Sequence, residues 1–419
     1  MPIDELIISG ILAATLIGQL VQIPLLGLDV PVWDVVAGIL LLVGFWQSWR
    51  SGRLAVALKR PVVKALLIFA GVILISYLAA IPALVASTSG LIISLLYALR
   101  LICYLFLGVL LVSEISWSKA ARYQRIIIWG SVLFIAVGLF ELAIFPDFRI
   151  YDQLGWDPHQ HRLIASFLDP NFTAIWLSGA TGLFLSLFLV AKSKLQKVAT
   201  GALIVFGLGA TLLTLSRSGL LALAGVIASI AATRWQRWMW AGGLILIAAL
   251  FLVPQIRGRL NGAFELDTTT RYRLASYEEA GTIIKRYPLL GIGYNTLKFR
   301  RYDVALPGTS KLISRFEDGL IRSDQLKSRA DAGFDSSLLT ILATTGIIGL
   351  GAFLWWVWLA VYGAWQYCRT STTALYSRWF LAFTAGLFLS SWFVNAWLYP
   401  PILLLWLITM ALADHEQQA

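Results

Sequence analysis

Long apolar runs alternate with short polar loops along most of the chain. Taking roughly 20 apolar residues as the length of a helix that crosses a bilayer, we predict about twelve membrane spans. They lie at 6–27, 32–49, 63–84, 90–113, 124–145, 170–191, 198–215, 218–233, 237–254, 335–361, 378–395 and 398–413. The runs are continuous rather than alternating at every second residue, which favours helices over a membrane barrel.

One polar segment, 255–334, interrupts this pattern. It is too polar to cross a bilayer and too long for a tight turn, so it should lie in water at one membrane face or on that face. We therefore predict an all-α polytopic membrane protein. It forms a single integral membrane domain, 1–419, with one long extracytoplasmic loop that carries short helices. The first span lacks a basic leader and a cleavage site, so we expect it to be retained.

Basic residues gather in the loops that follow every second span. These loops carry Arg50, Arg53, Lys59, Arg60, Lys64, Lys119, Arg122, Arg125, Lys192, Lys194, Lys197, Arg234, Arg237, Arg369 and Arg378. Short basic loops stay in the cytoplasm, so we place both termini there and the 255–334 loop on the extracytoplasmic side. The chain is 59% hydrophobic with a net charge of +11. In a membrane protein that charge reflects cytoplasmic loops, and no nucleic-acid partner is expected.

The first polar motif runs from His161 to Phe172, where the sixth span begins. Asp169 is well placed to cap this helix with Pro170 at its first position, and capping alone would explain both residues. Arg162 has no capping task. It stands at the outer boundary of the membrane, where a phosphate or an acidic residue would be its natural partner.

The second motif is Ser216-Arg217-Ser218-Gly219, between spans seven and eight. The turn is so short that Arg217 is held at the hydrocarbon edge beside a helix N-terminus. An arginine at a helix N-terminus is a ready anion site, although an arginine reaching towards lipid headgroups would look the same.

The third motif begins at Arg271 and Arg273 and continues to Gly293. Leu274, Tyr277, Ala280, Ile284 and Tyr287 recur at helical spacing, which predicts an amphipathic helix that ends at Pro288. Basic residues in the first turn oppose the helix dipole, which suggests an anionic partner outside the helix. A solvated surface arginine is the alternative.

Asp335 lies where the 255–334 loop meets the tenth span. Its place before Ser336 is typical of a helix N-cap, and residue chemistry alone favours that role. A carboxylate there could also take a proton from a hydroxyl nucleophile. Arg100, inside the fourth span, could pair with Glu141 or another buried acid, or line a cavity.

Taken together, the motifs resemble the O-antigen ligase and O-antigen polymerase family of bacterial membrane glycosyltransferases. The resemblance covers about 150–360 and rests on four stretches in order. They are Arg162 with Pro170-Asn171, Ser216-Arg217-Ser218-Gly219, the run from Arg273 through Tyr287-Pro288-Leu289-Leu290-Gly291-Ile292-Gly293, and Ala343 with Gly346-Ile347-Ile348-Gly349. The chain departs from the family where a His-Asn pair is usual, because Asp335 and Ser336 stand there.

The resemblance implies transfer of a glycan from undecaprenyl diphosphate to an acceptor hydroxyl, without metal or cofactor, at the outer face of the bacterial inner membrane. The acceptor is lipid A–core in ligases and a second lipid-linked glycan in polymerases. Arg217 and Arg273 match the family's diphosphate-binding arginines, and Arg162 and Arg271 are further candidates. Asp335 replaces the histidine that activates the acceptor, which moves the prediction away from a strict ligase.

Two other functions stay open. A small-anion transporter of the bicarbonate type, also proposed within this family, should have polar or broken helices near the membrane midplane, and Arg100 is the main candidate for such a feature. A non-catalytic assembly protein would not need arginines in three outer motifs. The polar motifs all lie at the outer edge, which favours the enzyme.

Overall fold

The computed structural model describes residues 2–25, 28–83, 88–149, 159–234, 268–297 and 334–419. The first half contains these elements: α1 (Ile3–Ile17), β1 (Gln22–Leu25), β2 (Leu28–Pro31), α2 (Val32–Arg50), α3 (Arg53–Ala57), α4 (Pro61–Ala80), η1 (Ile81–Ala83), α5 (Thr88–Glu114), η2 (Trp117–Lys119) and α6 (Ala120–Ile144). The second half contains η4 (Ala165–Phe167), α7 (Pro170–Val190), α8 (Lys194–Leu213), α9 (Arg217–Arg234), α12 (Thr268–Arg286), α15 (Ser337–Thr370), α16 (Tyr376–Ser390) and α17 (Pro400–Glu416).

Within the described residues, seven stretches of helix are long and apolar enough to cross a membrane. They are α2, α4, α5 from Gly90, Trp117–Ile144, α7, α8 and α15. The chain is therefore a multi-pass helical membrane protein, as the apolar pattern predicts. α1, α16 and α17 are shorter, with 15, 15 and 17 residues. The predicted span 237–254 and the loop segments 255–267 and 298–333 lie outside the described residues.

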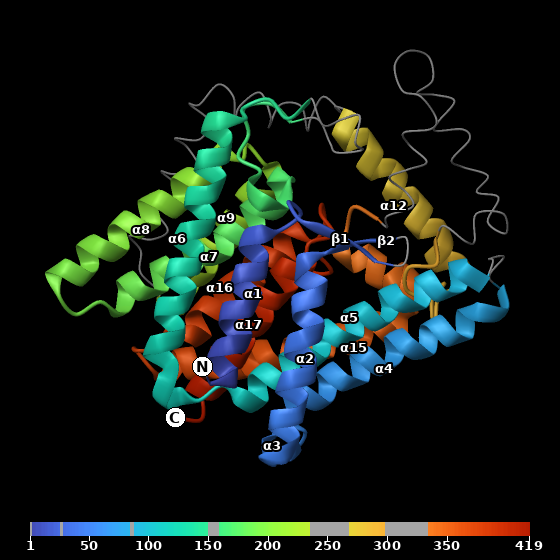
Figure 1. Cartoon of the computed structure of the whole chain (residues 1–419), viewed down its shortest axis with the longest axis horizontal. Helices are drawn as coiled ribbons and strands as arrows, with labels where there is room; N and C mark the ends of the chain where they lie inside the picture. The colour runs from blue at the N-terminus through green and yellow to red at the C-terminus, as the bar shows by residue number, and fades with distance from the viewer. Residues whose placement is uncertain (1, 26–27, 84–87, 150–158, 235–267, 298–333) are drawn as a thin grey trace.

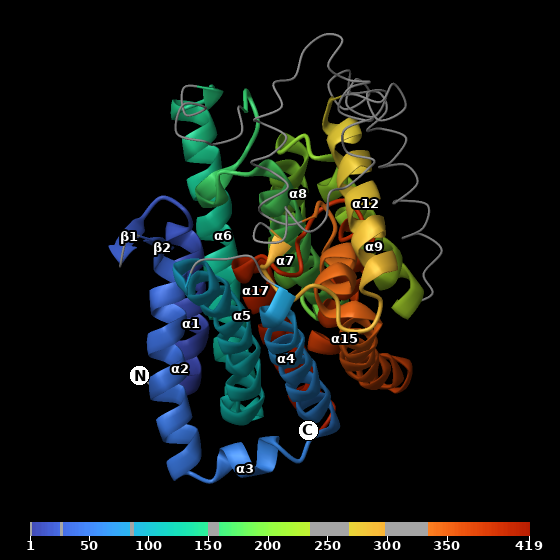
Figure 2. The same ribbon diagram turned by 90° about the vertical axis from the view of Figure 1, so that its right-hand side faces the viewer.

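The helices form a bundle with α12 across its upper part, while both termini lie in the lower half (Figures 1 and 2). We call the end that carries Asp169, Arg217 and Ser336 the site end. The opposite end, which carries Glu5, Glu114 and Glu416, is the termini end. α17 is buried along its length in the middle of the bundle, so even the last helix belongs to the core.

The prediction of a first span at 6–27 is wrong in its second half. α1 ends at Ile17, and Gly18 follows with φ 57°. A Cβ on Gly18 would lie 2.2 Å from the carbonyl oxygen of Ser166, so glycine is required where the helix ends. β1 (Gln22–Leu25) and β2 (Leu28–Pro31) then pair antiparallel, with Gln22 opposite Pro31. The expected all-α fold therefore carries one small β element.

Candidate functional site at one end of the bundle

Arg162 ties the segment before α7 to the end of α8. Its Nε donates to the carbonyl oxygen of Thr214 at 2.9 Å, and the neighbouring Leu163 N–H donates to the carbonyl of Leu213 at 2.9 Å. A cation beside the last carbonyls of a helix is favourable, because these groups lack partners within the helix. The predicted anion ligand Arg162 thus has a structural role that the sequence did not indicate.

Asp169 caps α7 as predicted. Its Oδ1 accepts from the backbone N–H groups of Asn171 at 2.6 Å and Phe172 at 3.1 Å, and Pro170 fills the first helical position. The cap leaves the Asn171 side chain to make contacts elsewhere. Its Oδ1 accepts from Ser216 Oγ at 2.7 Å and Ser218 Oγ at 3.3 Å. The first and second motifs are therefore joined through Asn171.

Arg217 is the first residue of α9 and lies between the two serines that Asn171 holds. Ser216 caps the helix by accepting from Gly219 N–H at 3.2 Å. Gly219 lets α9 approach α7 closely, because a Cβ there would lie 2.2 Å from the Ala174 Cβ. The half-buried Arg217 is thus fixed at a helix N-terminus, the arrangement that favours binding of an anion.

The third and fourth motifs form one backbone joint. α15 is broken at Gly346, where φ is 66° and ψ is −170°. The peptide groups freed by the break pair with the turn after α12, since Ile347 N–H donates to the Pro288 carbonyl at 2.8 Å. A Cβ on Gly346 would lie 2.1 Å from the Leu289 carbonyl oxygen, and one on Gly291 would lie 2.4 Å from the carbonyl carbon of Thr344. These motif glycines are required by close packing.

The same joint bears on the transporter alternative. A broken helix inside a membrane bundle can bind a transported ion through its open peptide groups. Here the groups at the break bind the chain instead, because the N–H groups of Ile292 and Gly293 donate to the carbonyls of Ala343 and Thr344 at 3.0 and 2.9 Å. The peptide groups at the break therefore bind the turn after α12.

α12 confirms the helix that the third motif predicts, and it brings Arg273 to the start of α15. Tyr277 Oη donates to the Trp392 carbonyl, and Ser276 Oγ accepts from the Asp335 N–H at 3.1 Å. Burial raises the pKa of the Tyr277 phenol, while the charge of Arg273 lowers it and that of Asp335 raises it further. Arg273 and Asp335 are therefore both within electrostatic reach of Tyr277. Arg271 lies in α12, and its side chain is outside the described residues.

The expectation that Asp335 caps the tenth span is wrong. Ser336 is the N-cap of α15, and its Oγ accepts from the Leu339 N–H at 3.3 Å. That hydroxyl also donates to the Ser391 carbonyl at 2.9 Å, which fixes the serine in the cap position. Asp335 is one residue earlier and is exposed. The carboxylate is consequently not needed for the helix terminus.

Two features were not specified by the sequence analysis. Arg100 pairs with an acidic residue, one of the alternatives it offered, but the acid is Asp34 rather than Glu141, with 2.8 Å between Nε and Oδ1. The turn after α16 receives contacts from both α12 and α15, since Ser391 O accepts from the Ser337 N–H at 2.9 Å and Trp392 O from Tyr277. The polar residues between Ser390 and Asn395, which interrupt an apolar region, were the available signal for this turn.

The fold and site define a multi-pass helical membrane protein with two pairs of polar motifs, the first pair joined through Asn171 and the second at the break in α15. Residues 202–354 match the family model described as O-Antigen ligase, which supports the O-antigen ligase/polymerase family. This range contains Arg217, Arg273 and Asp335 and begins after Arg162. No curated protein matches the chain. The family match gives no support to the transporter alternative.

Proposed function

We propose that the chain is a membrane glycosyltransferase that moves a glycan from undecaprenyl diphosphate to an acceptor hydroxyl. The observation that carries this proposal is the position of Arg217. It begins α9 between two serines held by Asn171, within the stretch that matches the O-antigen ligase family. Arg217 and Arg273 bind the diphosphate, and Arg162 positions the turn that carries Arg217.

The proposed transfer needs positive charge where the leaving group develops negative charge. The acceptor oxygen bonds to the anomeric carbon of the donor, and the bond from that carbon to the diphosphate oxygen breaks. The electron pair leaves with undecaprenyl diphosphate, where guanidinium groups stabilise it. A fixed arginine at a helix N-terminus is suited to this role, because helix dipole and side chain act on the same anion.

Asp335 takes the proton of the acceptor hydroxyl in this scheme. Its exposure and its release from helix capping support the role, since a base must be open to an incoming acceptor. The position corresponds to the histidine of the related family. An aspartate has a shorter reach than a histidine, so we expect an acceptor other than the lipid A–core of strict ligases, such as a second lipid-linked glycan.

The proposed topology puts the site end at the periplasmic face of the bacterial inner membrane and both termini in the cytoplasm. The termini end carries the basic loops, which is the arrangement of cytoplasmic loops in membrane proteins. The donor lipid would then approach from the outer leaflet.

Glycan profiling of a deletion strain, with separate analysis of lipid-linked intermediates, tests this proposal. A polymerase predicts accumulation of single repeat units on the lipid carrier. A ligase predicts accumulation of long polymer on the same carrier. Unchanged lipid-linked and polymeric pools would overturn the proposal, and altered uptake of inorganic carbon in that strain would identify a transporter.

A further inference from the structure

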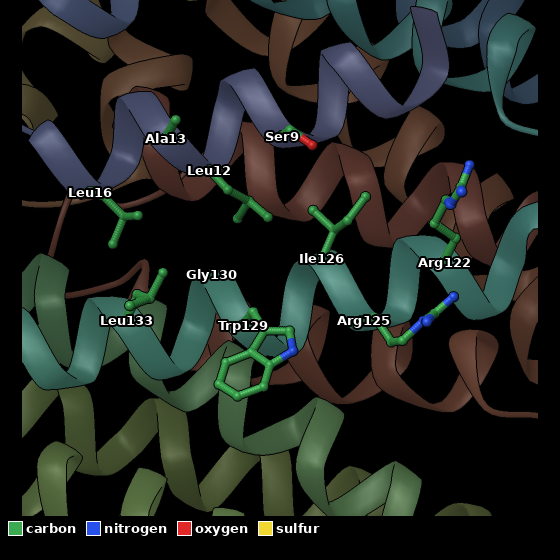
Figure 3. A pocket seen from close by; sticks show the side chains of 10 residues that line it. All are labelled: Ser9, Leu12, Ala13, Leu16, Arg122, Arg125, Ile126, Trp129, Gly130 and Leu133. Carbon is green, nitrogen blue, oxygen red and sulfur yellow. The ribbon is translucent and has the colours of Figure 1, made fainter. Parts of the chain in front are cut away.

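A groove of about 540 Å³ lies between α1 and α6, on the outside of the bundle (Figure 3). Its α1 wall includes Ser9, Ala13 and Leu16, and its α6 wall includes Ile126 and Leu133. This groove contains none of the predicted site residues.

Small residues explain the groove. They allow the two helices to cross closely, and they leave the space beside the crossing unfilled. A Cβ on Gly130 would lie 3.0 Å from Leu12 Cδ1, so the helices touch there. Ser9 and Ala13 then leave room along the flank of α1, and the walls are otherwise mostly apolar. The exposed ring of Trp129 borders this space.

Charge is confined to one end of the groove, where Arg122 and Arg125 project from α6 (Figure 3). Arg122 is paired with Glu5, with 2.6 Å between Nη1 and Oε1. Arg125 is exposed, and within the described part of the chain its side chain makes no ion pair or hydrogen bond. The groove therefore has an apolar wall and one available cation at its termini end.

These dimensions match one leaflet of a bilayer. Arg125 and Leu133 are eight residues apart on α6, which corresponds to about 12 Å along a helix. One leaflet contributes about 15 Å of hydrocarbon. A bound phospholipid requires a cation at the level of its headgroup, which Arg125 supplies. It is also favoured by an exposed tryptophan one turn further along the helix and by an apolar channel beyond it.

We propose that this groove binds one anionic glycerophospholipid. An acyl chain lies between α1 and α6, and the headgroup phosphate contacts Arg125. The lipid comes from the leaflet at the termini end, opposite to the leaflet that would supply the glycan donor. This site does not depend on the proposed glycosyl transfer.

Native mass spectrometry of the full chain, released from bilayers with equal amounts of phosphatidylglycerol and phosphatidylethanolamine of identical acyl chains, tests this site. We expect the wild-type protein to retain phosphatidylglycerol preferentially. Arg125→Gln should lower this occupancy by about fivefold, the effect of one arginine at a membrane surface. Arg369→Gln is the matched control, because Arg369 is, like Arg125, an exposed arginine at the termini end, but it lies in the last turn of α15, outside the groove.

Ala13→Trp provides a second test, because its side chain would fill the groove and should displace the lipid whatever its headgroup. Equal retention of the two lipids by the wild type would overturn the proposal. An equal loss in Arg125→Gln and Arg369→Gln would also overturn it, because it would indicate non-specific attraction. A dimer that Ala13→Trp abolishes would instead identify a second copy of the chain as the occupant.

Discussion

The two ends of the bundle use charged residues in different ways. At the termini end, buried carboxylates are matched by basic residues of the same chain. Lys119 Nζ lies 2.8 Å from Asp4, and Arg53 Nη2 lies 2.8 Å from Glu114. The carboxylate of Glu416 accepts from three backbone N–H groups at the start of α16, two of them at 2.7 Å. These charges hold the helices together.

At the site end, the motifs are positioned mainly by neutral groups. Asn171 holds Ser216 and Ser218, Ser276 receives the Asp335 N–H, and Ser336 caps α15. Asp169 and Arg162 are the charged exceptions, since Asp169 caps α7 and Arg162 donates to a backbone carbonyl. Charge at the termini end therefore contributes to stability. At the site end, the helix-positioning contacts described above do not involve the side chains of Arg217 and Asp335.

The largest expected effect at the site end comes from Arg217→Ala. We expect glycan transfer to fall by about 300-fold, the size of effect that follows loss of one group stabilising a developing anion. The free energy of unfolding should fall by about 1 kcal/mol, the usual cost of a single substitution, because the Ser216 cap and the Asn171 contacts remain. Transfer from lipid-linked donor by purified protein and thermal unfolding measure the two quantities. Full transfer activity in this variant would contradict the idea that charged residues serve glycan transfer at the site end and stability at the termini end.

Asp335→Asn should lower transfer by about 100-fold, because the amide keeps the shape of the side chain but does not accept the proton. Its thermal unfolding should match that of the wild type, since Ser336 supplies the cap. An unfolding temperature that falls while transfer persists would assign Asp335 to the structure instead.

Asp4→Asn should show the opposite behaviour at the termini end. Breaking the contacts of this buried carboxylate with Lys119 and Tyr123 should cost about 2 kcal/mol of unfolding free energy. Transfer by the protein that remains folded should be unchanged. A stable variant would show that the ion pairs at this end are dispensable.

The same carboxylate gives a pH dependence with a definite sign. Burial raises the pKa of Asp4, but the hydrogen bonds from Lys119 and Tyr123 outweigh burial, and the pKa is lowered overall from 3.8. A lowered pKa in the folded protein adds stability above pH 3.8, and this stability is lost as the pH falls through the folded value. Below about pH 4, the free energy of unfolding of the wild type should therefore fall more steeply with decreasing pH than that of Asp4→Asn.

The smallest expected effect comes from Ser336→Ala, which removes the cap of α15 next to the proposed base. Loss of a serine N-cap should cost about 1 kcal/mol of unfolding free energy. Transfer should stay within about twofold of the wild type, because no charge is altered. Thermal unfolding and the same transfer assay, run beside Asp335→Asn, separate the cap from the base. If Ser336→Ala lost as much transfer activity as Asp335→Asn, Ser336 would have a role in transfer as well as in capping.

Local patterns in the sequence predicted much of this architecture. Continuous apolar runs predicted most of the helices, Asp169 before Pro170 predicted the cap of α7, and the spacing of Tyr277 with its neighbours predicted α12. Each of these features depends on residues within a few positions of one another. The proximity of Arg273 and Asp335, in contrast, depends on how α12 docks against the start of α15.

The remaining features depend on contacts between distant segments or on a single residue of register. The end of α1 involves a close contact of Gly18 with Ser166. Arg100 pairs with Asp34, which lies 66 positions away in the sequence. Asp335 and Ser336 are both good N-caps, and only the contact of Ser336 with Ser391 decides between them. The break in α15 at Gly346 is stabilised by the turn at Pro288, a pairing that the two glycine motifs alone did not indicate.

Arg217 is expected to form part of a diphosphate site at the site end. Binding of undecaprenyl diphosphate to the purified protein tests it most directly, with Arg217→Gln compared against the control Arg369→Gln. We predict that Arg217→Gln weakens binding by about tenfold, the loss expected for a charge-assisted contact, while Arg369→Gln binds as the wild type does. Equal affinities of all three proteins for this lipid would contradict the account.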